Sequence, residues 1–379
     1  MTPSFPSLTF PNHYTLATGL YPEAHGIVGN SFWDPDLQAE FYYTDPARSL
    51  DAKWWAAGEP FWVSAEKQGV RSAVHMWPGS EAPIQGIYAS TVDKYKGDEA
   101  LDSKVARILG FLDRPGPEAP APAPAPADRT RPQLIAAYVP DVDADGHKFG
   151  PNSTEINATI RRVDAMLDKL FRGLQARNLT DIVNLVVVSD HGMATTDTSR
   201  LIQLEDLVDP AAIQHTDGWP LYGLRPRNPD HVPALHAQLR AKAAATPHFD
   251  VYLRDADMPA RYHFSRNPRI APLWIVPRTG WAIVRRDELD VEHARLSGQV
   301  YHPRGLHGYD DQDPLMRAIF IARGPAFGSR RNALLEPFQN INVYNILCDT
   351  LGITPHPNNG TLRLPLRPVG THPPESEST

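Results

Sequence analysis

The sequence predicts an α/β fold in which a doubly wound, mostly parallel sheet carries helices on both faces. Four short apolar runs, rich in β-branched residues and bounded by turn residues, are typical of buried parallel strands: residues 72–76, 134–139, 184–189 and 317–322. Between the second and third runs lies a helical pattern. A strand, a helix and a strand in this order form the repeating unit of a doubly wound sheet.

The predicted helix has a single apolar stripe along its length. Ser153 or Thr154 could cap its start, because either hydroxyl can accept a backbone N–H of the first turn. Apolar side chains at steps of three and four define the stripe: Ile156, Ile160, Val163, Leu167, Leu170 and Leu174. We expect this face to pack on the sheet.

The length of 379 residues is compatible with one large α/β domain that carries insertions. We expect a single catalytic domain over residues 1–367. The Ala/Pro-rich stretch 114–129 can build neither a ladder nor a helix, so we predict an extended insertion loop there. The Pro- and Ser-rich residues 368–379 are predicted to form a disordered tail.

Composition narrows the classes of partner and metal site. The formal net charge of −7 argues against binding to a nucleic-acid polymer, which needs a basic face. Cys348 is the only cysteine, so an intrachain disulfide and a thiolate metal cluster are both excluded. No run of about 18 apolar residues predicts a membrane span, and the first residues show no signal-peptide pattern. Any bound metal would need His, Asp and Glu ligands.

Acidic and histidine residues follow two of the predicted strands directly. Asp143 and His147 lie four residues apart, in a predicted loop with Gly146. Asp190 and His191 are adjacent at the end of the next strand, before a glycine that would permit a sharp turn. Open α/β sheets bind ligands beyond the carboxyl ends of their strands. Together with His307, these carboxylates and imidazoles are suited to Zn²⁺.

Each of these motifs alone also fits a purely structural role. The chain has fifteen histidines, so any one Asp-His pair could arise by chance on the surface. The acidic residues near position 143 could form a solvated turn, and His307 could be an ordinary loop histidine. Their joint occurrence at the strand ends favours the metal site.

Thr9 has two compatible interpretations. It precedes Phe-Pro-Asn, so it could be a helix N-cap with Pro11 in the first turn. A hydroxyl at a helix N-terminus also faces the positive end of the helix dipole, which favours a bound phosphate. A threonine hydroxyl becomes an effective nucleophile only when a base or a metal activates it.

Residues 5–30, which include Thr-Phe-Pro-Asn-His-Tyr at 9–14, closely resemble the nucleotide pyrophosphatase/phosphodiesterase family of the alkaline phosphatase superfamily. The likeness covers nearly the whole catalytic region apart from the Ala/Pro insertion and the tail. It continues through residues 58–63, 77–80, 146–151, 189–193, 305–308 and 357–361. The resemblance implies an alkaline-phosphatase-like fold and two zinc ions per chain in the complete site.

The resemblance also implies a role for each matching metal ligand. Thr9 would be the nucleophile and would contact one zinc, together with Asp190 and His191. The second zinc would be bound by Asp143, His147 and His307. Asp143 is preferred over Asp141 because the family spacing is Asp-X-X-Gly-His.

For the substrate, the resemblance implies a nucleotide or another small phosphodiester. Asn30 would donate a hydrogen bond to a phosphate oxygen. Phe10 and Tyr95 match the aromatic pair that sandwiches the base, although for both rings ordinary packing is the structural alternative. Two zinc ions about 4 Å apart would hold the phosphoryl group while Thr9 forms a covalent phospho-threonine intermediate. The product would be a nucleoside monophosphate.

Two other functions stay open on this reading. The first is a lipid-headgroup phosphodiesterase or a phosphomonoesterase of the same superfamily. The second is an inactive fragment or pseudoenzyme with a binding role. The resemblance also indicates a secreted or membrane-anchored extracellular protein, although the compartment is not visible in the sequence.

The sequence departs from the family pattern before Thr9. Family members begin with a strand that ends in Asp-Gly, and that aspartate binds the zinc beside the nucleophile. Residues 1–8 contain no aspartate. We therefore expect that the strand and the ligand lie upstream of Met1, and that the chain as written is poorly soluble or weakly active.

Overall fold

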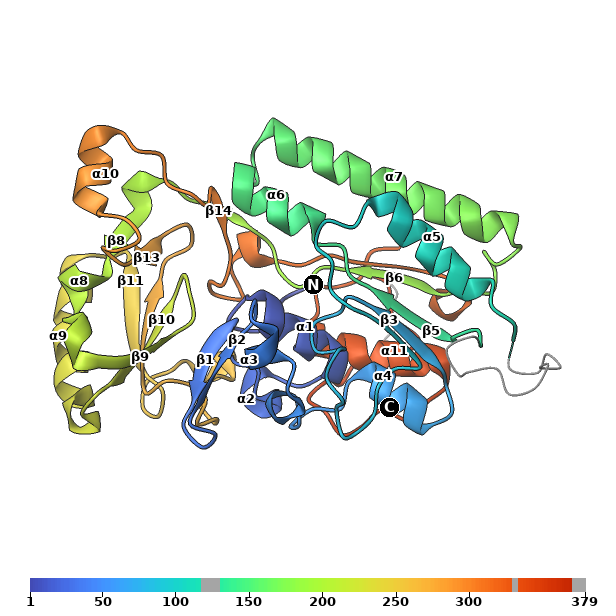
Figure 1. The fold of residues 1–379 in the computed structure, drawn as a ribbon, viewed down its shortest axis with the longest axis horizontal. Helices are drawn as coiled ribbons and strands as arrows, with labels where there is room; N and C mark the ends of the chain where they lie inside the picture. The colour runs from blue at the N-terminus through green and yellow to red at the C-terminus, as the bar shows by residue number, and fades with distance from the viewer. Residues whose placement is uncertain (117–129, 329–332, 370–379) are drawn as a thin grey trace, which may run out of the picture.

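A computed structural model describes residues 1–116, 130–328 and 333–369 of the chain. Figure 1 shows two groups of elements, with the N-terminus between them. One group contains β3, β5, β6 and the long helix α7, and the other contains β8–β13 with α8–α10. None of the helices in the described part combines the length and the apolarity needed to cross a membrane.

The first group is built on a parallel sheet with the strand order β4-β3-β5. His75 at the end of β3 pairs in register with Asp93 on one side and Ala137 on the other. Helices cover both faces of this sheet, α5 and α7 on one and α4 and α11 on the other (Figure 1). The predicted α/β class is therefore confirmed. The bounds are β3 Ser72–His75, β4 Thr91–Asp93, β5 Leu134–Ala137, α4 Phe61–Lys67, α5 Leu101–Leu112, α7 Thr154–Ala176 and α11 Val343–Leu351.

Two of the predicted strands differ from expectation. β6 (Leu185–Val188) pairs with β15 (Phe320–Arg323) in antiparallel orientation, so the prediction of a parallel strand over 317–322 is wrong. The four residues of β6 are only half-buried, and Ile321 of β15 is 59% exposed. No second strand partner of β6 lies among the described residues, which leaves its apolar side chains less covered than those of a central strand.

The predicted helix between β5 and β6 is α7, and Ser153 rather than Thr154 is its cap. The Ser153 hydroxyl accepts the Ile156 N–H at 3.1 Å. Most of the apolar stripe packs inward, with Ile156, Leu170 and Leu174 buried. Ile160 is the exception: it is 48% exposed, because the buried face also takes in Thr159 and Met166 and so leaves Ile160 at its edge.

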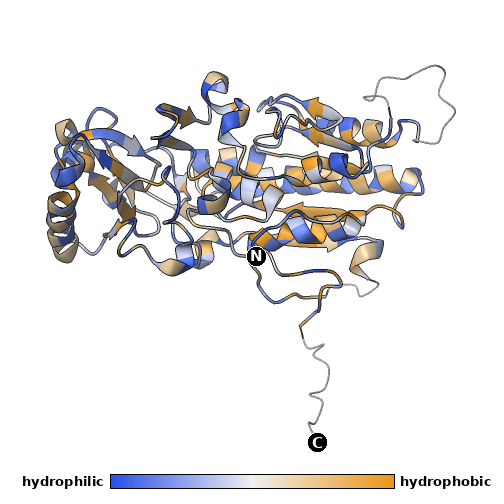
Figure 2. Ribbon diagram, turned by 90° about the horizontal axis from the view of Figure 1, so that it is seen from below, coloured by the Kyte–Doolittle hydropathy of each residue, from blue (hydrophilic) through white to orange (hydrophobic). Residues whose placement is uncertain are grey.

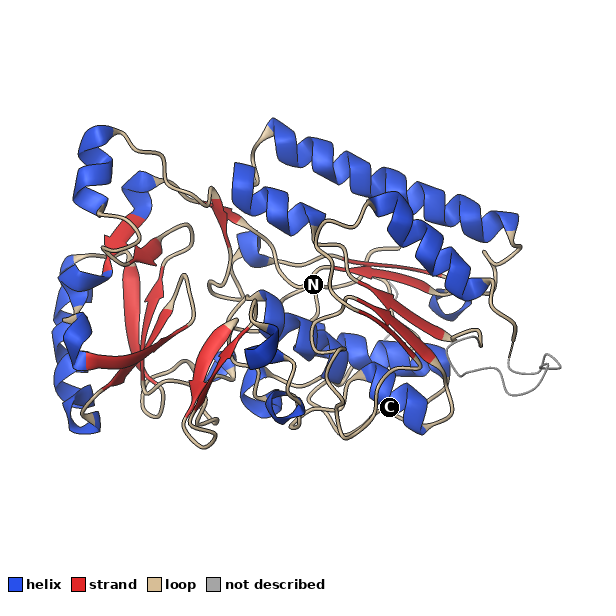
Figure 3. Ribbon diagram, in the orientation of Figure 1, coloured by secondary structure: helices blue, strands red, loops and turns tan. Residues whose placement is uncertain are grey.

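The second group contains a four-stranded antiparallel sheet of order β11-β12-β10-β9, drawn in red beside helix α9 in Figure 3. It has a hydrophobic core of its own around Leu224, Val251 and Ile275. The sequence analysis did not predict this sheet. The bounds are β9 Ile213–Asp217, β10 Tyr222–Pro226, β11 Phe249–Leu253, β12 Leu273–Pro277, α9 Val232–Ala245, α8 Leu204–Leu207, α10 Val291–Ser297, and the parallel pair β8 Leu201–Gln203 and β13 Ala282–Val284.

The N-terminal segment lies between the two groups. Helix α1 (Thr9–Thr18) is buried along eight of its ten residues. It belongs to the largest core of the molecule, which is rich in tryptophan and includes Trp54, Trp55 and Trp62. Figure 2 shows the apolar strands and helix faces gathered inside this region. The remaining short elements are α2 Pro22–His25, α3 Pro46–Ser49, α6 Asp141–Phe149, and the antiparallel pairs β1 Ser31–Asp34 with β2 Ala39–Tyr42 and β7 Ala194–Thr195 with β14 Gly305–Leu306.

The two predicted irregular segments fall largely outside the described residues. Of the 114–129 insertion, residues 117–129 are not described, and of the 368–379 tail, residues 370–379 are not described. At the base of the insertion, Arg131 N–H donates to the Pro115 carbonyl at 2.8 Å. Pro368 and Val369 pair with residues 334–335, so the first two residues of the predicted tail are ordered.

Candidate metal centre and nucleophile

Asp143 and His147 lie on helix α6, which corrects the prediction that they belong to a loop. The helix begins directly after Pro140, and two aspartates in its first turn face the positive end of the helix dipole. Positions four apart share one face of a helix. The structure accordingly places Asp143 Oδ1 3.5 Å from His147 Nε2.

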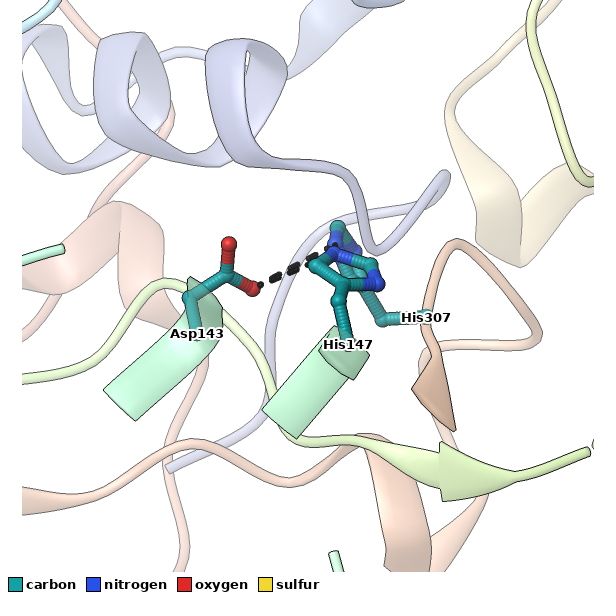
Figure 4. Close-up of side chains that lie close together, drawn as sticks. All are labelled: Asp143, His147 and His307. Carbon is teal, nitrogen blue, oxygen red and sulfur yellow. Dashed lines mark hydrogen bonds and ion pairs between the residues drawn. The ribbon is translucent and has the colours of Figure 1, made fainter. Parts of the chain in front are cut away.

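His307 reaches the same place from β14. A Cβ at Gly305 would lie 2.3 Å from the Gly146 carbonyl oxygen, so only glycine lets this strand approach α6 so closely. His307 Nε2 lies 3.1 Å from His147 Nε2 and 3.6 Å from Asp143 Oδ1. Figure 4 shows the three side chains converging on one point. Their ligand atoms all lie within 4.8 Å of one another.

Asp190 and His191 follow β6 and lie against this group. A Cβ at Gly192 would lie 2.1 Å from the Leu315 carbonyl oxygen, so close packing, rather than the predicted sharp turn, requires this glycine. His191 Nε2 lies 3.1 Å from Asp190 Oδ2. The His191 ring stacks on the His307 ring with centroids 3.5 Å apart. The two predicted ligand pairs and His307 therefore form one contiguous cluster.

Thr9 is the first residue of α1, and its hydroxyl lies 3.3 Å from His191 Nε2. Leu8 occupies the N-cap position without a side-chain hydrogen bond, so the interpretation of Thr9 as a cap is wrong. The Phe10 N–H is satisfied by the Asn30 side-chain oxygen at 3.0 Å. That bond holds Asn30 at the start of the helix, and its Nδ2 group donates to none of the described residues.

Backbone carbonyls select the tautomer of each histidine in the cluster. The Nδ1 atoms of His147, His191 and His307 lie 2.8–2.9 Å from the carbonyl oxygens of Gly305, Gly192 and Ser7, respectively. A carbonyl oxygen only accepts, so each Nδ1 carries the proton, and in the neutral ring each Nε2 presents a lone pair to the site. This is the ring orientation that metal-ligating histidines adopt.

Burial and the neighbouring charges shift the pKa values of the cluster residues, and for His191 and Asp190 these two effects oppose each other. Burial alone would lower the pKa of His191, but the Asp190 carboxylate raises it to about 9. Burial and the two neighbouring imidazoles hold the pKa of His307 well below its usual value. Burial opposes ionisation of Asp190, yet His191 and His13 keep its pKa well below the usual range. Asp190 is therefore ionised in the folded protein, as a metal ligand must be.

A divalent cation fits the group formed by Asp143, His147 and His307. Asp143 Oδ1 is buried and has no hydrogen-bond partner among the described residues, although it faces three Nε2 atoms. A lone pair facing another acceptor is unfavourable unless a cation lies between them. Near Thr9, Asp190 and His191 supply two further ligands. The predicted aspartate upstream of Thr9 stays a prediction.

The two predicted base contacts, Phe10 and Tyr95, have different surroundings. The Phe10 ring contacts Tyr43 at 5.4 Å between centroids and also contacts Phe41 and Trp55. Tyr95 is 58% exposed. Burial and then the Asp143 and Asp141 carboxylates raise the pKa of its phenol, which places Tyr95 within electrostatic reach of the candidate metal group.

Three residues of the site were missed by the sequence analysis: His13, Tyr43 and Tyr138. His13 Nδ1 donates to the Thr9 carbonyl at 2.9 Å, and the same nitrogen lies 3.2 Å from Asp190 Oδ2. The Tyr138 ring packs on His13. The signal for His13 was its place four residues after Thr9 on the same helix face, whereas nothing in the local sequence distinguishes Tyr43 and Tyr138 from core aromatics.

Comparison with known proteins adds a family match and several relatives. The family model described as type I phosphodiesterase / nucleotide pyrophosphatase matches residues 1–310. A Schizosaccharomyces pombe protein named as an uncharacterized pyrophosphatase/phosphodiesterase is 43% identical over 97% of this chain and 73% of its own length. Ectonucleotide pyrophosphatase/phosphodiesterase family member 3 of Bos taurus is 35% identical over 95% of this chain, which spans only 39% of that relative.

The solved structure of murine ectonucleotide pyrophosphatase / phosphodiesterase 5 has a similar fold. It superposes with a TM-score of 0.82 at 31% identity and covers 95% of this chain and 88% of its own. An inactive threonine-to-alanine variant of that mouse protein, solved in complex with AMP, gives the same TM-score and coverage.

Proposed function

Because the chain belongs to the type I phosphodiesterase / nucleotide pyrophosphatase family, we propose that it hydrolyses phosphodiester or pyrophosphate bonds of nucleotides and releases a nucleoside monophosphate. The AMP complex of the mouse relative supports a nucleoside monophosphate as the product class. The name ectonucleotide, given to the animal relatives, supports action outside the cell.

One observation carries this proposal. The Nε2 atoms of three histidines converge on the Asp143 oxygen that has no hydrogen-bond partner among the described residues, and the Thr9 hydroxyl lies 3.3 Å from the Nε2 of His191. The hydroxyl is also at the N-terminus of α1, where backbone N–H groups favour a phosphate. A nucleophile, an anion-binding helix end and a metal-ligand group thus meet at one place.

We infer that Asp143, His147 and His307 hold one zinc ion, and that Asp190, His191 and Thr9 contribute to a second. Nitrogen and carboxylate ligands of this kind suit Zn²⁺. Zinc at these ligands would supply charge neutralisation at the phosphoryl oxygens and a lowered pKa of the Thr9 hydroxyl.

Thr9, Asn30 and His13 have separate roles in the proposed reaction. Thr9 Oγ1 forms a bond to phosphorus while the bond from phosphorus to the leaving-group oxygen breaks, and the hydroxyl proton passes to solvent. Water then cleaves the phospho-threonine ester and restores the hydroxyl. Asn30 Nδ2 is free to donate to a phosphate oxygen in both steps. His13 holds Asp190 against the start of α1.

Phe10 and Tyr95 are the proposed contacts of the nucleobase. Phe10 follows the nucleophile directly, and its ring is fixed by Phe41, Tyr43 and Trp55. Tyr95 is exposed and lies near Asp143. Aromatic faces of this kind favour a nucleotide over a substrate without a planar ring.

Three chromogenic substrates distinguish the candidate activities. We expect the zinc-loaded protein to hydrolyse p-nitrophenyl-TMP with a kcat/KM at least about tenfold above that for p-nitrophenyl phosphate or p-nitrophenylphosphorylcholine. Thr9→Ala should reduce turnover by about 1000-fold or more while zinc stays bound, because the nucleophile is lost. Release of p-nitrophenol is measured by absorbance.

Thr18→Ala is the matched control, since Thr18 lies at the other end of α1 and its hydroxyl bonds only to backbone. It should keep turnover within about twofold. Faster turnover of the choline ester would favour a lipid-headgroup phosphodiesterase. Undiminished turnover by Thr9→Ala would contradict the nucleophile assignment, and no turnover of any substrate by the upstream-extended chain would favour a binding role.

A further inference from the structure

A cluster of five charged side chains lies outside the candidate metal centre. We call it the ionic cluster, and it consists of His75, Asp93, Glu99, Lys104 and Arg107. His75 ends β3 and Asp93 ends β4, while Glu99 lies just before α5 and Lys104 and Arg107 lie within that helix. His75 and Lys104 are each 1% exposed, and Glu99 is 9% exposed. None of these residues was singled out by the sequence analysis.

His75 lies between two carboxylates. Its Nδ1 is 2.9 Å from Asp93 Oδ2, at hydrogen-bond geometry. Its Nε2 is 2.6 Å from Glu99 Oε2, an ion-pair contact without the alignment of a hydrogen bond. His75 therefore lies in contact with both Asp93 and Glu99.

Two cations of α5 complete the ionic cluster. Arg107 contacts Glu99 at 2.6 Å and Asp93 at 3.5 Å, so it bridges the same two carboxylates as His75. Lys104 Nζ lies 3.4 Å from Glu99 Oε2 and 3.3 Å from Met76 Sδ. Both carboxylates are thereby compensated, as a buried charge requires.

The two carboxylates are the two ends of one loop. Residues 94–98 connect Asp93 to Glu99, and Tyr95 is the second residue of this loop. The loop contains no helix or strand, and the Tyr95 N–H donates to Glu81 Oε1 at 3.0 Å. The position of Tyr95 therefore depends on how Asp93 and Glu99 are held.

The residues that follow His75 in the chain contact helix α1. Met76, with a positive φ of 65°, and then Trp77 follow His75 directly. Trp77 donates its indole N–H to the His13 carbonyl at 3.2 Å and packs on the His13 ring. His75 thus connects the Tyr95 loop to the helix that carries Thr9 and Phe10.

We propose that His75 is a positioning residue that fixes the Tyr95 loop, through Asp93 and Glu99, so that the Tyr95 ring is held where it can contact a nucleobase. The inference rests on the proposed function. It makes the ionic cluster a determinant of specificity for the base of the substrate, because the cluster contacts neither Thr9 nor the metal ligands. Changes in the ionic cluster should therefore not alter the kinetics of a substrate that lacks a base.

The test compares a substrate with a base, p-nitrophenyl-TMP, with one that lacks it, methyl p-nitrophenyl phosphate. We expect His75→Gln to raise the KM for p-nitrophenyl-TMP about tenfold and to leave kcat within about twofold, because base stacking is lost in binding. The kinetics of the methyl ester should be unchanged. Glu99→Gln, a more conservative change, should act in the same direction.

A double-mutant cycle separates positioning from general destabilisation. Tyr95→Ala should raise the KM for p-nitrophenyl-TMP by a similar factor, and His75→Gln should add less than about twofold in the Tyr95→Ala background. His236→Gln is the matched control, since His236, on the distant helix α9, forms a histidine-carboxylate contact with Asp257. This substitution should leave the KM and kcat for both substrates unchanged.

The outcomes distinguish this inference from the proposed function. If the unmodified protein hydrolyses neither diester, the proposed function itself fails. If it hydrolyses both, and His75→Gln either changes nothing or affects the two substrates equally, the positioning role alone is overturned. Additive effects of His75→Gln and Tyr95→Ala would overturn it as well.

Discussion

Asp143 and Asp145 have opposite surroundings although they lie two residues apart on α6. Asp143 Oδ1 faces the imidazoles of His147 and His307 without a hydrogen-bond partner. Asp145 instead contacts Thr159 and Arg162 of α7. A helix turns by about 200° over two residues, so neighbouring acidic positions of this kind face different surroundings.

This difference makes a prediction about zinc. Asp143→Asn should weaken zinc binding roughly 100-fold or more and reduce the zinc content by about one ion per chain, because one anionic ligand is lost. Elemental analysis after dialysis against a defined free-zinc concentration measures this change.

Asp145→Asn is the control for the metal prediction. It removes one carboxylate from the same helix, and with it the same single negative charge, but it should leave the zinc content unchanged. Equal zinc content in Asp143→Asn and the unmodified protein would remove Asp143 from the ligand set.

At the scale of elements, α1 depends on one buried amide. Asn12 is fully buried, and its Oδ1 accepts from the Ser4 N–H and from Asn340 at 2.8 Å each. Its Nδ2 donates to the carbonyls of Ser4, Pro6 and Leu8 at 2.9–3.2 Å. These bonds fold residues 4–8 against the first turn of α1, where Thr9 begins the helix.

Asn12→Ala should therefore lower the free energy of unfolding by about 3 kcal/mol, because it leaves several buried backbone groups without partners. Urea denaturation followed by tryptophan fluorescence measures the change. The control is Asn157→Ala, because the exposed Asn157 side chain donates only to the Ser153 carbonyl among the described residues. It should cost less than about 0.5 kcal/mol, and an equal cost for both variants would contradict the role of Asn12.

At the scale of the whole molecule, Asp217 of β9 joins the second group of elements to β1 of the N-terminal segment. Its carboxylate accepts the Trp33 N–H of β1 at 2.9 Å and contacts Arg225 of β10 at 3.0 Å. Burial raises the pKa of Asp217 to about 6, although Arg225 acts in the opposite direction. The protonated form is therefore favoured on folding, relative to a carboxyl group in the unfolded chain.

The sign of the resulting pH dependence follows from linkage. A raised pKa gives a stabilisation that is complete below the unfolded value near pH 3.8 and is lost as the pH rises through about 6. Relative to Asp217→Asn, the unmodified protein should lose on the order of 3 kcal/mol of stability between pH 4 and pH 7. Urea denaturation across this range measures it. A difference that stays constant, or that grows in favour of the unmodified protein, would contradict the raised pKa.

The sequence predicted part of the first group of elements, because those signals are local. Short apolar runs bounded by turn residues identified β3, β5 and β6, and a period-3.6 apolar stripe identified α7. The direction of β15 was not predictable, since strand orientation depends on the path of the chain between distant segments. The four-stranded sheet was not predicted either, because its strands are short and the pairing of β10, β11 and β12 joins segments far apart in the chain.

For the candidate site, the residue types and their spacing determined the ligand set that we propose, because Zn²⁺ requires nitrogen and oxygen donors from a short list of side chains. Only the tertiary structure decided that Asp143 and His147 share a helix face, that carbonyls set the three histidine tautomers, and that His13 holds Asp190. It alone brought His75, Asp93 and Glu99 together. These contacts join residues far apart in the chain, and their geometry depends on packing that no local sequence pattern encodes.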